Sequence, residues 1–320
     1  MAIESLRTTA FGSTGMEITR VGFGAWAIGG GDWQFGWGPQ EDDDSVAAIH
    51  RALELGVNWI DTAAGYGFGR SESVVGRVLA ELPSGSRPYV FTKASILPGP
   101  DGRTVVRTLK HDSVIREAHA SLERLGLEAI DLYQIHRPNP DDEIEEGWSA
   151  FVELKEQGLV RHIGVSNFDV AQLRRVQQIA PVETLQPQYS LLSREIEDEI
   201  LPYTHEHGIG VIGYSPMASG LLSGGMTRER IDALPDNDWR SASPRFREPE
   251  LSENLALVER LRAVGDRYAT TPGAVATAWT LLHPAVDAAI VGFRRPDQVE
   301  PMLAATNLEL TAADLEEIGV

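Results

Sequence analysis

Short apolar runs alternate along the chain with longer segments in which apolar residues recur at helical spacing. A short run bounded by glycine, proline or polar residues is typical of a buried strand, whereas the longer segments are typical of amphipathic helices. Strands are predicted at 21–25, 57–61, 89–93, 130–136, 162–166, 184–188, 210–214 and 288–291. Helices are predicted at 42–55, 71–82, 113–125, 144–157, 170–179, 196–207, 252–268 and 272–282. Two more short strands, 8–11 and 16–19, flank a Gly-Ser-Thr-Gly turn and predict a hairpin before the first internal strand.

Strands that alternate with helices in this way form one of two main folds, an open doubly wound sheet or a closed barrel. The open dinucleotide-binding sheet requires Gly-x-Gly-x-x-Gly after its first strand. Residues 22–27 supply the first two glycines and lack the third, and no linker or change of composition divides the chain. The sequence therefore predicts an α/β protein with one (β/α)8 TIM-barrel domain over residues 1–320 and an N-terminal β-hairpin.

Composition narrows the classes of partner. The 320 residues are 42% hydrophobic, include no cysteine and carry a formal net charge of −19. Without cysteine there are no disulfides, thiolate metal sites or cysteine nucleophiles. The negative charge argues against nucleic acid or an anionic membrane as the main partner, because both are polyanions. The first residues show no signal-peptide pattern and no apolar stretch approaches a membrane span, so a cytoplasmic protein is expected.

Polar side chains stand at the ends of most predicted strands. They are Asp61, Lys93, His136, Ser166 with Asn167, Gln188 and Tyr214. In a barrel the carboxyl ends of all parallel strands open onto one face, which is where barrel enzymes have their active sites. Tyr66 follows Asp61 in a turn rich in glycine and alanine, which lets the phenol fold back toward the carboxylate. Each residue alone has a structural explanation, but together they predict a polar site at one end of the barrel.

Two of these residues indicate the kind of chemistry. Lys93 closes a buried strand, which costs desolvation unless a carboxylate such as Asp61 lies beside it. Such a lysine either lowers the pKa of a neighbouring phenol or serves as the nucleophile of a Schiff base. His136 ends an apolar strand, and no pair of histidines has the spacing of a metal-binding helix, so no metal is expected.

Four motifs that contain these residues resemble the aldo-keto reductases. They are Asn-Trp-Ile-Asp-Thr-Ala at 58–63 with Tyr66, Phe-Thr-Lys at 91–93, Asp-Leu-Tyr-Gln-Ile-His at 131–136 and Gly-Val-Ser-Asn-Phe at 164–168. The motifs occur in that family's order and spacing, and the resemblance covers nearly the whole chain. It implies an (α/β)8 barrel that binds a nicotinamide cofactor in extended form at its carboxyl end. The family's catalytic tetrad falls on Asp61, Tyr66, Lys93 and His136.

The resemblance also implies a reaction, the reduction of an aldehyde or ketone to an alcohol by hydride transfer from NADPH. Negative charge develops on the carbonyl oxygen in such a reaction, and Tyr66 would be the general acid that neutralises it. A free phenol has a pKa of about 10, so Lys93 is expected to lower it as a cation, itself held charged by Asp61. His136 would either align the carbonyl oxygen or share in proton donation.

The same resemblance assigns residues to the cofactor. Ser166, Asn167 and Gln188 would hold the nicotinamide carboxamide, and Tyr214 would stack on the ring. The pyrophosphate loop would supply Ser215, Pro216, Met217, Ser219, Gly220 and Leu221. At the adenosine end the contacts would come from Gly292, Arg294 and Gln298.

An arginine at the adenosine end favours NADPH over NADH, because it can bind the 2′-phosphate by charge-assisted hydrogen bonds. Arg295 is expected instead to meet a nearby carboxylate such as Asp297. Pro301 and Met302 stand where many relatives have Glu-Asn, which predicts weaker contacts to adenine.

Two other functions fit part of the pattern. A Schiff-base aldolase on a similar barrel would use Lys93 but would leave Ser166 and Asn167 without a task. A non-catalytic NADPH-binding regulatory subunit is the second alternative, since the β subunits of potassium channels resemble the same family. The partner is expected to be a small carbonyl compound that meets an apolar wall formed by Trp26, Trp33, Phe35, Trp37 and Phe68.

Overall fold

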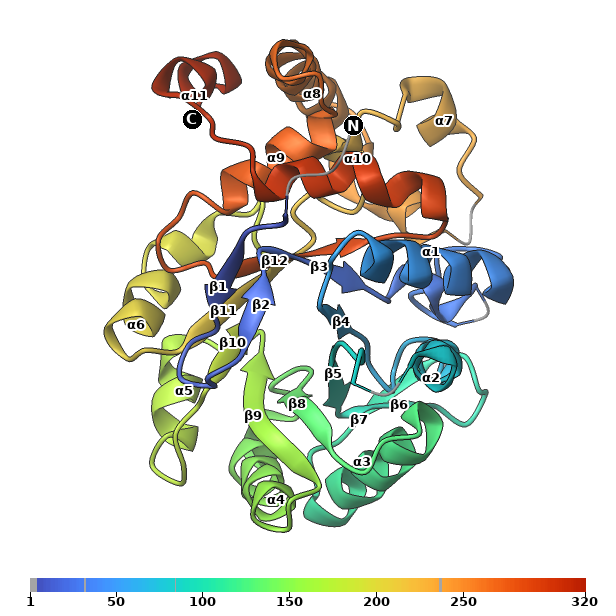
Figure 1. The fold of residues 1–320 in the computed structure, drawn as a ribbon, viewed down its shortest axis with the longest axis vertical. Helices are drawn as coiled ribbons and strands as arrows, with labels where there is room; N and C mark the ends of the chain where they lie inside the picture. The colour runs from blue at the N-terminus through green and yellow to red at the C-terminus, as the bar shows by residue number, and fades with distance from the viewer. Residues whose placement is uncertain (1–4, 32, 84, 236–237) are drawn as a thin grey trace.

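The computed structural model describes residues 5–31, 33–83, 85–235 and 238–320. Parallel strands form a closed eight-stranded barrel with helices around its outside (Figure 1). The strands, in order around the ring, are β3 (Val21–Gly24), β4 (Trp59–Asp61), β5 (Tyr89–Ala94), β8 (Ile130–Ile135), β9 (Val160–Ser166), β10 (Thr184–Gln186), β11 (Gly210–Tyr214) and β12 (Ala288–Gly292). Strand β12 pairs with β3 and closes the ring. The predicted (β/α)8 barrel is confirmed.

The helices of the barrel lie close to their predicted positions. They are α1 (Asp42–Glu54), α2 (Arg70–Glu81), α3 (His111–Leu125), α4 (Ile144–Glu156), α5 (Val170–Val176), α6 (Ile200–Glu206), α8 (Glu250–Arg267) and α9 (Pro272–Thr280). The predicted helix 196–207 is divided, because a 3₁₀ turn at Glu195–Glu197 precedes α6. Among the described residues, no helix combines the length and the apolar character needed to cross a bilayer.

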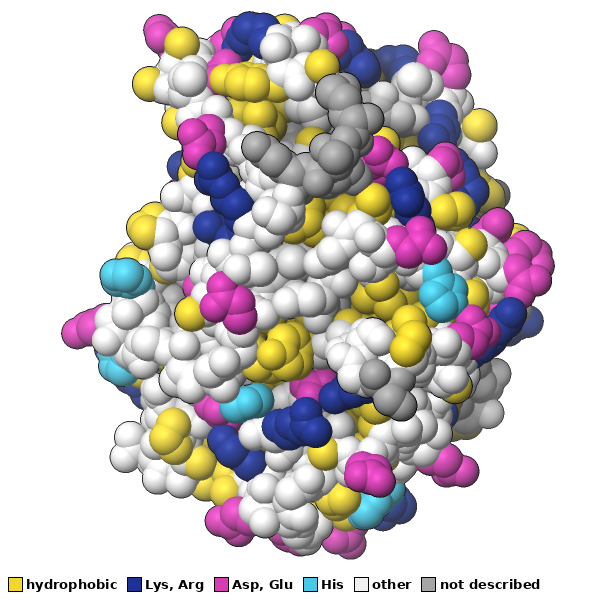
Figure 2. Space-filling view, viewed as in Figure 1, with side chains coloured by type: hydrophobic (Ala, Val, Ile, Leu, Met, Phe, Trp, Pro, Cys, Tyr) yellow, Lys and Arg dark blue, Asp and Glu magenta, His cyan; other side chains and the backbone are white. Residues whose placement is uncertain are grey.

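The predicted N-terminal hairpin closes the amino end of the barrel. Strand β1 (Thr8–Ala10) pairs antiparallel with β2 (Glu17–Thr19), and the two lie across the strand ends (Figure 1). Phe11 at its turn packs against Phe91 inside the barrel, with 5.9 Å between ring centroids. Gly12 has φ +49° and a side chain there would meet the backbone of Gly210, so the close approach requires glycine. On this side of the molecule, acidic and basic side chains are scattered in small groups of both signs (Figure 2).

Several elements lie outside the predicted pattern. A second hairpin, β6 (Ile96–Pro98) with β7 (Val105–Arg107), follows the end of β5 and begins after Ser95, which has φ +88°. The short helix α7 (Arg228–Asp232) lies in the long excursion after β11, and α10 (Val299–Leu303) and α11 (Ala312–Ile318) follow the last strand. These segments are too short for hydrophobic periodicity to reveal them.

Candidate active site

A cavity of about 750 Å³ opens at the carboxyl end of the barrel. The strand ends contribute much of its wall through Gly24, Asp61, His136, Ser166, Gln186, Tyr214, Ile290 and Gly292. The volume is within the range of small-molecule and cofactor sites. The face predicted from the polar strand ends is therefore the face that carries the cavity.

Asp61, Lys93 and Tyr66 form one buried network at the base of the cavity. The Nζ of Lys93 donates to Asp61 Oδ2 at 2.6 Å, to the carbonyl oxygen of Thr62 at 2.9 Å and to the hydroxyl oxygen of Tyr66 at 3.4 Å. Lys93 is completely buried and Asp61 nearly so, whereas Tyr66 and Asp61 reach the cavity wall. The ammonium group is thus surrounded by three acceptors.

Electrostatics in this network are set by burial. Removal from water raises the pKa of Asp61 and lowers that of Lys93, and their mutual contact opposes both shifts. Burial also raises the pKa of Tyr66 well above its ordinary value, and the charge of Asp61 adds to the rise. Burial first, and then the Asp61 charge, therefore set the net direction of this pKa, and the expected lowering by Lys93 stays a prediction. The Tyr66 hydroxyl is consequently protonated at neutral pH.

His136 faces the same spot from the end of β8. Its ring lies edge-on to Tyr66, with 5.4 Å between centroids, and its Nδ1 is buried without a hydrogen-bond partner among the described residues. Burial, and then the positive charge of Lys93 and Arg137, lower the pKa of His136 well below its ordinary value. The imidazole is therefore neutral and carries one N–H that can donate to a ligand.

A chain of amide and hydroxyl contacts runs around the rim beside His136. Asn167 has φ +64°, and its Nδ2 donates to the carbonyl oxygen of His136 at 3.0 Å and to Ser166 Oγ at 2.9 Å. Tyr214 donates from its hydroxyl to Asn167 Oδ1 at 2.7 Å. Ser166, Asn167 and Tyr214 all line the cavity, as the resemblance leads one to expect.

Gln186, and not the predicted Gln188, lies on the cavity wall. Gln186 ends β10 and donates from Nε2 to Asp61 Oδ1 at 2.8 Å. Gln188 lies beyond Pro187 in an isolated bridge to Tyr214 and is outside the set of described residues that line the cavity. The prediction extended the strand through Pro187, which has no N–H for a strand ladder. The position of that proline was the signal that could have identified Gln186.

The loop after β11 exposes backbone toward the cavity. Ser215, Ala218, Ser219 and Gly220 have φ of +56°, +47°, +59° and +88°. Such a run of left-handed residues turns backbone N–H groups toward a common centre, which suits an anion. Of the residues predicted here, Ser215, Pro216, Met217, Ser219 and Gly220 line the cavity, whereas Leu221 is buried beneath it.

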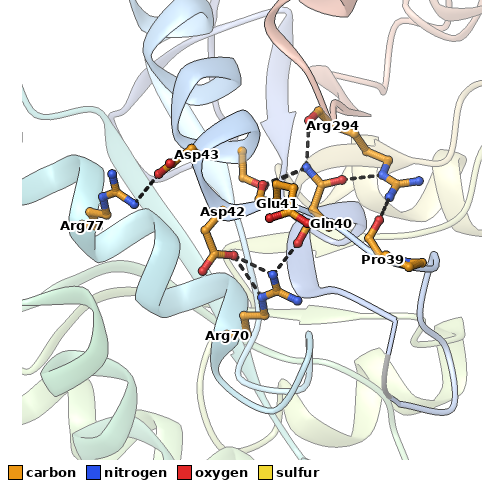
Figure 3. Close-up of polar contacts among 9 residues, drawn as sticks. Pro39, Gln40, Glu41, Asp42, Asp43, Arg70, Arg77 and Arg294 are labelled. Carbon is orange, nitrogen blue, oxygen red and sulfur yellow. Dashed lines mark hydrogen bonds and ion pairs between the residues drawn. The ribbon is translucent and has the colours of Figure 1, made fainter.

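Arg294 follows β12 at the far end of the cavity and is half buried. Its Nε donates to Gln40 Oε1 at 2.7 Å and its Nη2 donates to the carbonyl oxygen of Pro39 (Figure 3). Gln40 in turn donates from Nε2 to the carbonyl oxygen of Arg294 at 2.9 Å. Both acceptors, a side-chain amide oxygen and a backbone carbonyl oxygen, are neutral, so the guanidinium is held in place without losing its net charge.

The two neighbours of Arg294 in the prediction have different positions. Arg295 is exposed and pairs with Asp297 at 3.0 Å, as expected. Gln298 lines the cavity and accepts from the backbone N–H of Arg294 at 2.8 Å, and Gly292 lines the cavity as well. Arg230 and Arg240, which sequence reasoning missed, reach the same wall from the excursion after β11.

Aromatic side chains form the wall opposite the strand ends. Trp26, Trp33, Phe35 and Trp37 line the cavity, whereas Phe68 lies behind Trp33 at 5.8 Å between centroids. Trp239, which was also missed, stacks on Trp26 at 6.0 Å. Nothing near Trp239 in sequence signals this contact, because the excursion has no regular period.

A closed barrel that holds an acid, a lysine, a phenol and an imidazole together at its carboxyl end has the arrangement of a barrel enzyme. Comparison with known proteins identifies the family. The model of the Aldo/keto reductase family matches residues 20–319. An aldo-keto reductase of Bacillus subtilis, YhdN, is 35% identical over 312 residues, which cover 97% of this chain and 92% of that protein.

Two further proteins of known name are similar to this chain over nearly its whole length. The NADH-specific methylglyoxal reductase of Escherichia coli is 33% identical over 323 residues, covering 97% of this chain and 96% of that protein. The structure is similar to that of a glycerol dehydrogenase from Gluconobacter oxydans, with a TM-score of 0.86 and 35% identity over 99% of this chain and 94% of that one. The chain belongs to the aldo-keto reductase family, whose members are oxidoreductases that act on small carbonyl compounds with NADH or NADPH.

Proposed function

We propose that this protein reduces an aldehyde or ketone to an alcohol with NADPH, and that Tyr66 donates the proton. The observation that carries the proposal is the contact of Tyr66 with Lys93, and of Lys93 with Asp61, at the base of a cavity that His136 also enters. A general acid must lie within hydrogen-bond reach of the atom that it protonates, and Tyr66 is the phenol placed for this.

The proton donor is kept in its protonated form. Burial and the Asp61 charge raise the pKa of Tyr66, so the neutral phenol is available to an oxyanion that develops nearby. Lys93 orients the hydroxyl group by donating a hydrogen bond to it. Asp61 forms an ion pair with Lys93 and so stabilises its charged form, which burial alone would disfavour. Asp61 and Lys93 therefore position the donor rather than contact the substrate.

His136 acts as a neutral hydrogen-bond donor in this mechanism. Its lowered pKa keeps it uncharged, so it is a poor source of a full proton but can align the carbonyl oxygen with its remaining N–H. Tyr66 and His136 then approach the same oxygen from two sides. Of the two roles left open by the sequence, the geometry and charge favour alignment.

The residues along the cavity fit a nicotinamide dinucleotide, which supplies the hydride when it is bound. Asn167, Ser166 and Gln186 offer amide and hydroxyl groups beside the base of the cavity, where a carboxamide would bind. The exposed backbone at 215–220 suits a pyrophosphate, and Tyr214 offers its ring as a stacking surface.

Arg294 supports NADPH over NADH. The arginine is held by neutral acceptors and Arg230 reaches the same wall, so a 2′-phosphate would meet positive charge there. Arg240 lies on this wall too, but Asp238 pairs with it at 2.7 Å. The relative from Escherichia coli is named as NADH-specific, so both cofactors are compared directly.

An assay of carbonyl-dependent oxidation of NADPH and NADH tests the proposed function. We expect oxidation of NADPH that requires an added aldehyde or ketone and yields the alcohol in equal amount. If none of the aldehydes and ketones tested is reduced with NADPH or with NADH, the proposal is overturned.

The aldolase alternative can be tested in the same preparation. Lys93 is enclosed by Asp61, Thr62 and Tyr66 and does not reach the cavity wall, so it is not placed to attack a carbonyl. Borohydride added with a carbonyl compound should leave the mass of the protein unchanged. A trapped adduct on Lys93 would support a Schiff-base mechanism instead.

A further inference from the structure

Arginine is concentrated in the cavity of an otherwise acidic protein. The chain carries a formal net charge of −19, yet the cavity is lined by Arg107, Arg137, Arg230, Arg240 and Arg294. Among the described residues of this wall, Asp61 is the only carboxylate, and Lys93 neutralises it at 2.6 Å. A concave surface with one sign of charge concentrates ligands of the other sign.

The arginines act on two separate places. Burial lowers the pKa of Arg294, and the positive charges of Arg240 and Arg230 lower it further. Arg137 and Arg107 instead influence His136, whose pKa they lower after burial and Lys93. Burial raises the pKa values of Tyr66 and Tyr214, and the charge of Arg137 opposes both rises. One group therefore lies at the adenosine end and the other beside the reacting carbonyl.

The chain positions support this division. Arg137 directly follows His136 at the end of β8, and Arg107 is the last residue of β7, whose partner β6 places Ile96 on the same wall. A nicotinamide ring is uncharged or cationic and has no use for two guanidinium groups. The pyrophosphate and the 2′-phosphate are assigned to the other end of the cavity.

Neither arginine of the second group is neutralised within the described residues. No ion pair with a carboxylate is found there for Arg107 or Arg137, and the Nε of Arg107 is buried without a hydrogen-bond partner. Arg87 and Arg161 show the usual arrangement, since both pair with the buried Asp131 at 2.7 and 2.9 Å. Arg107 is partly buried, and a guanidinium in that position without an anion is costly unless a ligand supplies one. Arg137 is exposed at the rim of the same cavity, where its charge stays available to a ligand.

We infer that Arg107 and Arg137 form a subsite for an anionic group of the substrate, so that the substrate is a small carbonyl compound carrying a carboxylate or a phosphate. The inference rests on the proposed function and names its substrate class. Trp26, Trp33 and Phe35 receive the apolar part of such a molecule on the opposite wall. Hydride goes to the carbonyl carbon and the Tyr66 proton to its oxygen, while the anionic group is unchanged.

Matched pairs of substrates test the inference. The kcat/KM for 4-oxobutanoate is compared with that for butanal, and that for glyceraldehyde 3-phosphate with that for glyceraldehyde. A charge-assisted contact corresponds to a preference of about 10-fold to 100-fold for the anionic member of at least one pair. The pair that shows the larger preference identifies carboxylate or phosphate as the group bound.

Variants assign the preference to the two arginines. Arg137→Gln and Arg107→Gln should each lower the ratio of anionic to neutral kcat/KM about 10-fold. The ratio cancels any general loss of catalysis that follows from disturbing Tyr214. Arg137→Lys keeps the charge and should retain most of the ratio, which a purely structural role would not predict. Arg103→Gln, an exposed arginine in the turn between β6 and β7, is the matched control and should leave the ratio as in the wild type.

The failures of the two proposals are distinguishable. Reduction of neutral and anionic members with equal kcat/KM, or a preference that survives both glutamine variants, would overturn the anion subsite and leave the reductase intact. Absence of reduction for all four compounds with NADPH and NADH would overturn the proposed function and the inference with it.

Discussion

At the amino end of the barrel, the interior is filled by Phe11, Trp59 and Phe91. The ring centroid of Phe91 lies 5.9 Å from that of Phe11 and 5.2 Å from that of Trp59. At the carboxyl end, the same interior holds Asp61 and Lys93 in contact with amide groups. The first arrangement gains from every apolar group removed from water, whereas the second must offset the desolvation of two charges. Stability and chemistry are thus separated along the barrel axis, and mutations at the two ends should have opposite signatures.

The largest effect is expected from removing both charges at the carboxyl end. In Asp61→Asn/Lys93→Met the Tyr66 hydroxyl loses its orienting partner, so kcat/KM should fall about 1000-fold. Stability should change little or increase, because a buried ion pair replaced by neutral groups is often neutral or stabilising. Steady-state kinetics and urea unfolding measure the two quantities.

The converse variant at the amino end is Phe11→Ala. It should cost about 3 to 5 kcal/mol of unfolding free energy and leave kcat of the folded fraction within a few-fold of the wild type. A loss of kcat comparable to that of the double variant, or an equally large destabilisation by the double variant, would contradict the separation of roles.

A smaller effect concerns Glu117, a buried carboxyl on α3 behind the carboxyl end. It accepts from the backbone N–H of Ser95 at 2.9 Å and from Ser113 Oγ at 3.2 Å, and burial raises its pKa from 4.5 to about 7. The folded protein therefore binds the Glu117 proton more tightly than the unfolded chain. Its contribution is fully present below pH 4.5 and is lost as the pH rises through 7, a change of up to about 3 kcal/mol.

Glu117→Gln removes that titration while preserving a possible donor and acceptor. Urea unfolding at pH 5 and pH 8 should show that the fall in stability over this range is smaller in the variant than in the wild type. Asp287, whose pKa burial raises to about 6, adds a slope of its own that should persist in the variant. An unchanged difference between the two pH values would rule out Glu117 as the source.

The smallest effect is expected at the adenosine end. Arg294→Ala should remove most of a preference for NADPH over NADH of about 10-fold to 100-fold and leave the affinity for NADH nearly unchanged. Quenching of tryptophan fluorescence by each cofactor measures the four dissociation constants, and Arg295→Ala is the matched control because Asp297 already pairs that arginine. An equal loss of affinity for both cofactors would remove Arg294 from the phosphate site.

The barrel could be predicted from the sequence, and so could the cluster of Asp61, Tyr66, Lys93 and His136 at its carboxyl end, because both leave regular signals. Buried strands are apolar runs, and each run that ends in a polar residue places it at the same end of a barrel. The hairpin β6–β7 was missed, although its strands are as long as those of the predicted N-terminal hairpin. The Gly-Pro-Asp-Gly turn at 99–102 was the signal that could have identified it. Gln188 was taken for Gln186 because a run of strand-like residues hid the break at Pro187.

The arginines of the cavity other than Arg294 were missed for a different reason. Arg107, Arg137 and Arg240 belong to connecting segments, where the direction of a side chain depends on contacts with distant parts of the chain. The net direction of the Tyr66 pKa depends on burial and on the charge of Asp61, whereas the prediction considered the effect of Lys93. Polar residues at strand ends could be predicted from the pattern of the sequence, whereas loop residues such as Tyr66 and Arg294 were found through the family motifs that contain them.

The most direct test is the rate of hydride transfer in Tyr66→Phe, measured in a single turnover with bound NADPH. We expect the rate to fall by about 100-fold or more while the dissociation constant for NADPH stays within a few-fold of the wild type, because only the donor is lost. Tyr89→Phe, at the amino end of the same barrel, is the matched control and should transfer hydride at the wild-type rate. A Tyr66→Phe variant with a rate near that of the wild type would contradict the assignment of Tyr66 as the proton donor.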